Sequence, residues 1–399
     1  MSDSLNTPEG ILRAIKDSKI QTIDLRLTDL PGRWQRIAVP PSILERDTFE
    51  NGIEVSSSTC LQEISANGMR LIPDPTSAFL DPFSETPTLV LIAVNRDPLT
   101  GKGDPRDPRS IAQKAEAYVQ TSQIGDTANF GLELFVCGQD VGTIVATLAD
   151  IGIQATAHEA ETGGRAGIAM PFAPLTRAAD KLMIGRYVAG TVARRRGVTA
   201  TFVPAPLSVD DGSGLNVHQS IWHRGQPLFA GDGYAGSSAL MRHYMAGLLE
   251  HEAALLAICA PTPDSYRGPP PDPGPRANRG NLERDRAGAC CIPTYAPSPK
   301  AKRVEFRSPD PSCNPYLAFA AMLMAGIDGF ENRLYSLDPD QPIGHPYDLP
   351  LAELSKPPST PGSLEESLDA LAADHAFLVR GDVFTPDIIA AHLRYVQTR

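Results

Sequence analysis

The chain has 399 residues, is 42% hydrophobic and carries a formal net charge of −11, so it can build a large core in two or three domains. The acidic charge argues against nucleic acid or an anionic membrane as a main partner, although a local group of Arg and Lys can still bind phosphate. A polar start, no apolar run that could span a bilayer and six cysteines without a Cys-x-x-Cys pair predict a cytoplasmic protein with reduced thiols.

The first hundred residues show mainly strand patterns. Two alternating runs surround Pro31-Gly32 in "QTIDLRLTDLPGRWQRIAV", which predicts a hairpin. The apolar run "TLVLIAV" predicts a buried strand, and no long helix is expected before residue 100. The segment "LTGKGDPRDP" is rich in Gly, Asp and Pro and therefore separates a small sheet-rich domain (1–103) from a larger one (104–399).

Helix and strand patterns alternate in the larger domain. Apolar residues at helical spacing predict helices that cover 108–122, 138–152, 177–197, 237–260 and 314–332. Alternating or continuous apolar runs predict strands at 128–137, 153–161, 199–206, 214–222 and 302–309. The loop "YRGPPPDPGPRANRGN" has no apolar period, and loops of this length are usually functional or disordered.

Four predicted strands carry polar groups where buried strands usually carry apolar ones. A lone charged residue in a strand most often lies on a solvated face, so the shared pattern matters more than any single member. Arg303, Glu305 and Arg307 alternate, which fits either a surface ladder of ion pairs or the wall of a polar cavity where Arg grips phosphate or carboxylate. Carboxylates that converge from different strands would suit Mg²⁺. The polar strand residues are Glu133, His158, Glu159, His218, Glu305 and Arg307.

The strand "GLNVHQSIW" aligns polar side chains on one face. Asn216, His218 and Ser220 recur at every second position, about 7 Å apart, whereas Leu215 and Val217 take the other face. This alternation predicts a strand with one face in the core and one face that carries an amide, an imidazole and a hydroxyl.

Long segments of the sequence resemble class I glutamine synthetases. The stretch "RVEFRSPDPSCNPYLAFAAMLMAGIDG" resembles the C-terminal signature of that family, and "GSGLNVHQSIW" resembles its Gly-Ser-Gly-Met-His-x-His-x-Ser strand. The segments "LIPDPTSAFLDPF", "DPRSIAQKAEAY" and "YDLP" are similar as well, so the resemblance runs from about residue 20 to the end of the chain.

The resemblance implies an α+β fold with an N-terminal β-grasp-like domain and a catalytic domain whose curved antiparallel sheet is flanked by helices. It also implies a homo-oligomer, hexameric or dodecameric, in which each active site lies between neighbouring subunits. Members of the family join glutamate to ammonia through γ-glutamyl phosphate, using ATP and two Mg²⁺ or Mn²⁺ ions. The polar row of "GLNVHQSIW" is then expected to face a pocket for phosphate and metal.

Carried over residue by residue, the resemblance assigns metal ligands, nucleotide contacts and catalytic arginines. The metal residues are Glu133, Glu159, Glu305 and, in place of a family histidine, Asn216. The nucleotide residues are Phe172, His218, Ser220, Lys300 and Arg303. The catalytic residues are Arg286 and Arg307.

Several positions depart from the family pattern. Two metal carboxylates are replaced by Phe135 and Gly167, and a transition-state Arg is replaced by Cys291. Ser56 stands where a loop of the N-terminal domain normally gives the ammonium-site Asp, and Gly268 stands where an Arg normally binds the carboxylate of glutamate. The flap "PPPDPGPR" has no Glu, and the segment after the strand of Phe135 is much shorter than in the family.

These departures lead to two hypotheses. Lost charges and a lost metal would together cost about 10 kcal/mol of transition-state stabilisation, so the main hypothesis is a ring-forming, nucleotide-binding homologue with little or no ligase activity and one weak Mg²⁺ site. The alternative is an active ATP-dependent ligase, of the glutamine synthetase or γ-glutamyl-amine ligase type, with an altered acceptor. Tyr347 matches a tyrosine that some members adenylylate, but a packing role beside Pro346 and Pro350 is favoured.

Overall fold

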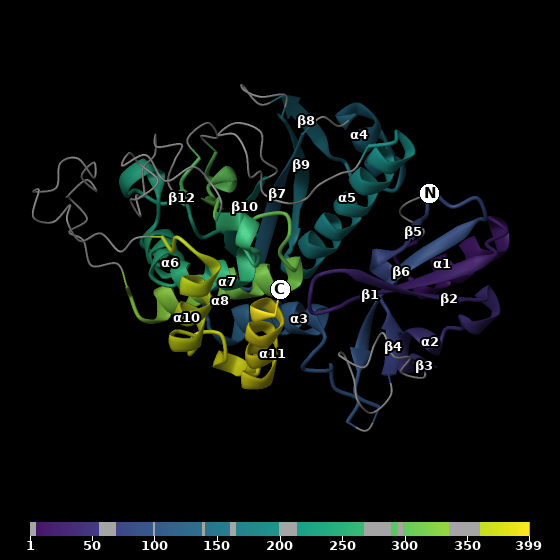
Figure 1. The fold of residues 1–399 in the computed structure, drawn as a ribbon, viewed down its shortest axis with the longest axis horizontal. Coiled ribbons are helices and arrows are strands. Elements are labelled where there is room, and N and C mark those ends of the chain that lie inside the picture. The colour runs from purple at the N-terminus through teal and green to yellow at the C-terminus, as the bar shows by residue number, and fades with distance from the viewer. Residues whose placement is uncertain are drawn as a thin grey trace, which may run out of the picture.

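The structure is a computed structural model that describes residues 5–55, 69–98, 100–137, 140–159, 165–198, 214–266, 289–293, 298–334 and 360–398. Two sheets form its framework, and helices join and cover them (Figure 1). The α+β fold expected from the sequence is confirmed. Among the described residues, no helix is both long enough and apolar enough to cross a membrane.

A six-stranded sheet forms the N-terminal part, drawn in purple and blue in Figure 1. Its strands lie in the order β2-β1-β6-β4-β3, with β5 beside β6, and β1 runs parallel to β6. Ile11, Ile23, Leu25 and Leu91 are fully buried in its core. The elements are α1 (Pro8–Asp17), β1 (Thr22–Thr28), β2 (Trp34–Val39), η2 (Pro41–Ile43), α2 (Thr48–Asn51), β3 (Ile53–Val55), β4 (Met69–Pro73), η3 (Pro75–Ser77), β5 (Phe79–Leu80) and β6 (Thr88–Arg96).

The hairpin predicted around Pro31-Gly32 is confirmed, because β1 pairs antiparallel with β2. Gly32 has a φ of +83°, and a Cβ at this position would lie 2.8 Å from Cα of Asn314, so both the turn and the approach of the second part require glycine. The expectation of a mainly strand-built region overlooked α1, which Thr7 caps and which buries only Ile11.

A seven-stranded antiparallel sheet forms the centre of the second part. Its strands lie in the order β12-β13-β10-β7-β9-β8, with β11 beside β10. Helices α3, α5 and α8 pack against one face of this sheet. The strands are β7 (Thr127–Cys137), β8 (Thr156–Glu159), β9 (Arg165–Pro174), β10 (Gly214–His223), β11 (Gln226–Pro227), β12 (Cys290–Cys291) and β13 (Val304–Phe306).

The described helices of the second part surround the sheet on its core side, and the C-terminal ones, drawn in yellow in Figure 1, lie beyond α7 and α8. The α-helices are α3 (Pro108–Thr121), α4 (Val141–Asp150), α5 (Leu175–Arg195), α6 (Ala239–Glu250), α7 (Glu252–Cys259), α8 (Pro315–Glu331), α10 (Leu364–Ala373) and α11 (Pro386–Gln397). The short 3-10 helices are η4 (Tyr234–Gly236), η5 (Pro263–Tyr266), η7 (Pro299–Ala301) and η9 (Arg380–Asp382).

Most elements expected in this part are confirmed, with ends shifted by a few residues. Strand β9 was not expected. The single helix predicted over 237–260 is two helices, α6 and α7, which meet at His251. The strand predicted at 199–206 lies outside the described residues.

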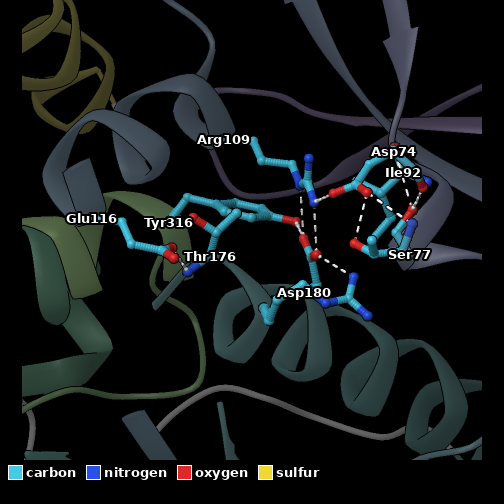
Figure 2. Close-up of polar contacts among 10 residues, drawn as sticks. Asp74, Ser77, Ile92, Arg109, Glu116, Thr176, Asp180 and Tyr316 are labelled. Carbon is cyan, nitrogen blue, oxygen red and sulfur yellow. Dashed lines mark hydrogen bonds and ion pairs between the residues drawn. The ribbon is translucent and has the colours of Figure 1, made fainter. Parts of the chain in front are cut away.

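An ion network around Arg109 joins the two parts, as Figure 2 shows. Arg109, on α3, is 1% exposed and donates from Nε and Nη2 to the two oxygens of Asp180 on α5, at 2.9 and 2.8 Å. Its Nη2 also lies 2.5 Å from Oδ2 of Asp74, just after β4, and the hydroxyl of Tyr316 on α8 donates to Asp180 at 2.7 Å. Because a buried charge needs close partners, this network fixes three helices against the N-terminal sheet.

Arg26 of β1 forms a second junction between the two parts. Its side chain is fully buried, and Nη2 donates to Oδ2 of Asp81 at 3.1 Å. Tyr187 of α5 donates to the same oxygen at 2.7 Å. The guanidinium carbon lies 4.2 Å from the centre of the Tyr187 ring and 4.5 Å from that of Trp34, so cation–π contacts add to the ion pair.

His251 connects the C-terminal helices to the rest of the second part. Its Nδ1 lies 2.7 Å from Oδ2 of Asp374, just after α10, and its Nε2 lies 3.1 Å from Oδ2 of Asp328 on α8. The ring stacks on Phe377 with 3.9 Å between the ring centres. Burial alone lowers the pKa of His251, but the two carboxylates raise this pKa to about 9, so the ring is charged at neutral pH.

Replacing Arg109 by Met is expected to destabilise the fold strongly. The change leaves the carboxylate of Asp180 buried with fewer partners, and breaking a buried pair in this way costs about 3–5 kcal/mol. Urea unfolding followed by circular dichroism measures the loss. Arg46→Ala is the control, because the Arg46 side chain is 77% exposed in its pair with Glu9 and contributes less than ~1 kcal/mol. A loss as small as that of the control in Arg109→Met would contradict the assigned role.

The free energy of unfolding is expected to fall between pH 6.5 and 9 because of His251. Its pKa in the folded chain is raised, so its stabilising contribution is fully present below the unfolded pKa of 6.5 and disappears as the pH rises through about 9. The expected fall is about 2–3 kcal/mol. Urea unfolding of wild type and of His251→Gln over this range measures it, with His223→Gln, an exposed histidine, as the control. Parallel curves for wild type and His251→Gln would refute the assignment.

Candidate active site

The register of the large sheet brings the polar strand residues together. Glu305 of β13 lies opposite His218 of β10, which in turn lies opposite Gly131 of β7. Two residues along β10, Asn216 lies opposite Glu133 of β7. Residues directly opposite each other in antiparallel strands share a face, and so do residues two apart in one strand. The polar side chains therefore lie on one face of the sheet, which we call the site face.

The site face is opposite the side of the sheet on which the described helices α3, α5 and α8 pack. Leu132, Leu134 and Val136 of β7 are buried in the core, so Glu133 and Phe135 between them point the other way. The same alternation in β10 and β13 turns the remaining polar residues to this side. The alternation of apolar and polar residues along each strand therefore separates the core face from the site face.

Glu305 is the most enclosed carboxylate of the site face. Its Oε1 accepts a hydrogen bond from Nε of Arg307 at 2.7 Å, and its Oε2 lies 3.6 Å from Sγ of Cys291. Burial alone raises the pKa of Glu305, but the bond from Arg307 and the nearby His218 and guanidinium charge lower it below the usual value. Glu305 is therefore a fixed negative charge in the centre of the site.

His218 is neutral at neutral pH, because burial lowers its pKa to about 4. Nε of Arg303 donates to its Nδ1 at 3.3 Å. The ring of Phe172 lies 6.2 Å from the His218 ring and covers Gly131, where a Cβ would lie 2.6 Å from the Phe172 ring. Gly131 is therefore needed to let an exposed aromatic ring lie beside the imidazole.

Glu133 is held on both of its carboxylate oxygens. Nδ2 of Asn216 donates to Oε2 at 2.9 Å, and Nε2 of His158 lies 3.1 Å from Oε1. The amide of Asn216 thus donates from Nδ2 to Glu133, and its Oδ1 is the atom that the sequence prediction assigns to a metal ion. His158 contributes a contact that the assigned set of site residues did not contain.

The other residues assigned from the sequence make no described contact with Glu133 or Glu305, or lie outside the described residues. Ser220 is buried on the site face and accepts a hydrogen bond from Nε1 of Trp222 at 3.0 Å, whereas Lys300 is exposed on η7. Glu159 is the last residue of β8, and its side chain is outside the described residues. The positions Ser56, Arg286, Gly268 and Tyr347 also lie outside the described residues.

Two carboxylates of the site face are candidate ligands for a divalent cation. Among the described residues, no group of three or more His, Cys, Asp and Glu side chains is placed to hold a metal ion. Glu133 and Glu305 nevertheless share the face, from strands on either side of β10. Mg²⁺ is commonly held by one or two carboxylates together with water and substrate phosphates. The pair therefore fits an ion whose other ligands come from a nucleotide and solvent.

Two family models match the chain. The one described as "Glutamine synthetase, beta-Grasp domain" matches residues 19–97, and the one described as "Glutamine synthetase, catalytic domain" matches residues 136–398. Curated proteins named glutamine synthetase match almost the whole chain: the one from Frankia alni is 41% identical over 97% of this chain and 94% of its own length. The chain belongs to the glutamine synthetase family. The protein of that name from Neisseria gonorrhoeae is 39% identical over 97% and 94%.

Solved structures agree with this fold. The glutamine synthetase of Plasmodium falciparum superposes with a TM-score of 0.85 at 20% identity, covering 98% of this chain and 95% of its own. GmaS without ligand superposes with a TM-score of 0.79 at 24% identity, covering 97% and 94%. The alignment with the Frankia glutamine synthetase spans 448 positions, more than the 399 residues of this chain, so the relative has positions that this chain lacks.

The hypothesis of a homologue with little or no ligase activity is wrong. Relatives that are 36–41% identical over 97–98% of this chain are named glutamine synthetase, which supports an active enzyme. The hypothesis considered the charges that were lost and not the contacts of the residues that are present, such as those of Asn216 and His158 with Glu133. The alternative hypothesis of an active ligase fits these relatives better.

The two thiols of β12 are expected to resist alkylation in the folded chain. Burial, and then the nearby Glu305, raise the pKa of Cys291 on the site face to about 12, and burial raises the pKa of Cys290 in the core well above its usual value. The thiolate is the reactive form, so both residues should remain unlabelled by iodoacetamide at pH 8. Mass spectrometry of the peptide that contains them measures this, and the urea-unfolded chain is the control. Rapid labelling of the folded chain would show that the site face is open at β12.

Proposed function

We propose that the chain is an ATP-dependent ligase of the glutamine synthetase type, which joins the side-chain carboxylate of glutamate to an amine. One observation carries the proposal: Glu133, His218, Glu305 and Arg307 project from three adjacent strands on one face of the sheet. The two carboxylates could bind a cation, and the guanidinium of Arg307 could bind an anion such as phosphate. Membership of a family whose members use ATP and divalent metal ions supports the same assignment.

The proposed reaction has two steps. A carboxylate oxygen of glutamate attacks the γ-phosphorus of ATP, and ADP leaves. The amine then attacks the acyl phosphate carbon, and phosphate leaves with its electron pair while the amine loses a proton. Negative charge gathers on the transferred phosphoryl group, so Arg307 is the described residue best suited to stabilise it.

The proposed metal and nucleotide contacts follow from the site face. Glu133 and Glu305 would hold one Mg²⁺, which supplies positive charge beside the phosphates when bound. The neutral His218 can donate one hydrogen bond to a phosphate oxygen. The exposed ring of Phe172 can stack on the base, since aromatic side chains stack readily on nucleobases. Ser220, Lys300 and Arg303 complete the proposed nucleotide contacts, and Arg286 the catalytic arginines. Glu159 is left out of the proposed ligands, because its position in β8 lies opposite Ala166, which pairs with the core residue Val136.

Ammonia is the first candidate for the acceptor, because the curated relatives are named glutamine synthetase. A larger amine is the second candidate. The observation that favours it is Ser56, which stands where the family places an anionic group for ammonium, so no carboxylate at that position selects a small cation. We also propose a homo-oligomeric ring, as in the family, with the chain divided at about residue 103.

ADP release in the presence of glutamate, Mg²⁺ and a panel of amines tests the proposal. We expect amine-dependent turnover with ammonia or with a larger primary amine. Glu305→Ala should lower kcat/KM by at least about 100-fold and weaken Mg²⁺-dependent ATP binding by at least about tenfold, because the ion loses a carboxylate. Glu54→Ala is the control, because Glu54 is exposed on the N-terminal sheet. The absence of amine-dependent turnover across the panel would refute the ligase assignment.

A further inference from the structure

The two family metal carboxylates that this chain lacks fall in one row of the sheet. Phe135 of β7 lies opposite Gly167 of β9, and Gly167 lies opposite His158 of β8. This row is next to the one that contains Glu133, and it lies on the same face. The replaced positions therefore surround one small part of the site face, beside Glu133.

The imidazole of His158 occupies that part of the site face. A Cβ at Gly167 would lie 2.3 Å from Cε1 and Nε2 of His158, so the ring lies where any side chain at this position would begin. The ring of Phe135 meets it edge to face, with 6.0 Å between centres and planes at 89°. Nε2 then points to Glu133 at 3.1 Å. Phe135 and Gly167 together leave the space that this imidazole fills.

This packing does not fit a second metal ion beside Phe135 and Gly167. A carboxylate at position 167 would require the imidazole to leave its place beside Glu133, because even the first side-chain carbon would overlap the ring. A phenyl ring at position 135 offers no ligand. Glu133 keeps acceptor capacity for a cation, since a carboxylate has about four lone pairs and His158 and Asn216 use two of them.

We propose that His158 is a positioning residue that takes the place of the second metal ion of the family, so that the site uses a single divalent ion. The imidazole fixes Oε1 of Glu133 while Asn216 fixes Oε2, which orients the carboxylate toward the one ion that it shares with Glu305. This inference rests on the proposed ligase function, and it concerns the number and placement of ions rather than the reaction itself.

The test counts Mn²⁺ ions bound per chain in the full-length protein with a non-hydrolysable ATP analogue, by equilibrium dialysis and electron paramagnetic resonance. Wild type is expected to bind one ion. The double variant Phe135→Glu/Gly167→Glu is expected to bind two, because it displaces the ring and restores two carboxylates. Gly167→Ala is the matched control: it displaces the ring without adding a ligand, so it should still bind one ion. Two ions in wild type, or one in a folded double variant, would overturn the inference.

A second readout tests the positioning of Glu133. His158→Ala should weaken binding of the single Mn²⁺ ion by about tenfold. Removing a group that orients a metal ligand typically lowers the affinity for the metal by about 10- to 100-fold, and this is the lower end of that range. His158→Gln should recover most of this loss, because its amide can donate in place of Nε2. Unchanged affinity in His158→Ala would refute the role. Two bound ions with full ligase activity would overturn this inference alone, whereas one bound ion without activity on any amine would overturn only the proposed function.

Discussion

The buried pair of Arg109 and Asp180 is the interaction on which the arrangement of the site depends. Asp180 lies in the second turn of α5, and α5 begins directly after β9, the strand that carries Phe172 and Gly167. Arg109 holds this helix and, through Asp74, the N-terminal sheet. A shift of α5 would therefore move β9 and the site face with it, and the same arginine links both to the N-terminal sheet.

The positions at which the sequence resemblance predicts other residues meet at the carboxylates of the site face. The resemblance leads us to expect an arginine at the position of Cys291 and a histidine at that of Asn216. In the structure the Cys291 thiol lies against Glu305, and Asn216 donates to Glu133. Gly167 leaves room for His158 on the same carboxylate. These side chains therefore enclose Glu133 and Glu305 in contacts that a count of missing residues does not include.

Alternation of apolar and polar residues predicted β7, β10 and β13, and the pairing of these strands then places Glu133, His218 and Glu305 on one face. It did not predict β9, because Gly167 and the bulge opposite Gly131 interrupt the period. The contact of His158 with Glu133 depends on the pairing register of β8 with β9, which no local pattern encodes. The break between α6 and α7 falls at His251, which is neither Gly nor Pro and whose ring lies against two carboxylates distant in the sequence.

Helix α8 supports the site face from the core side of the sheet, where Phe319 stacks on Phe130 of β7. It follows β13, which carries Glu305, and nearly every one of its residues is buried. Tyr316 in its first turn belongs to the Arg109 network, and Asp328 in its last turn binds His251 and Arg380. A helix of this length spans about 25 Å, so charged groups fix it at both ends and prevent it from sliding. Only residues 307–314 separate β13 from α8, so the position of the helix limits where β13, and with it Glu305 opposite His218, can lie.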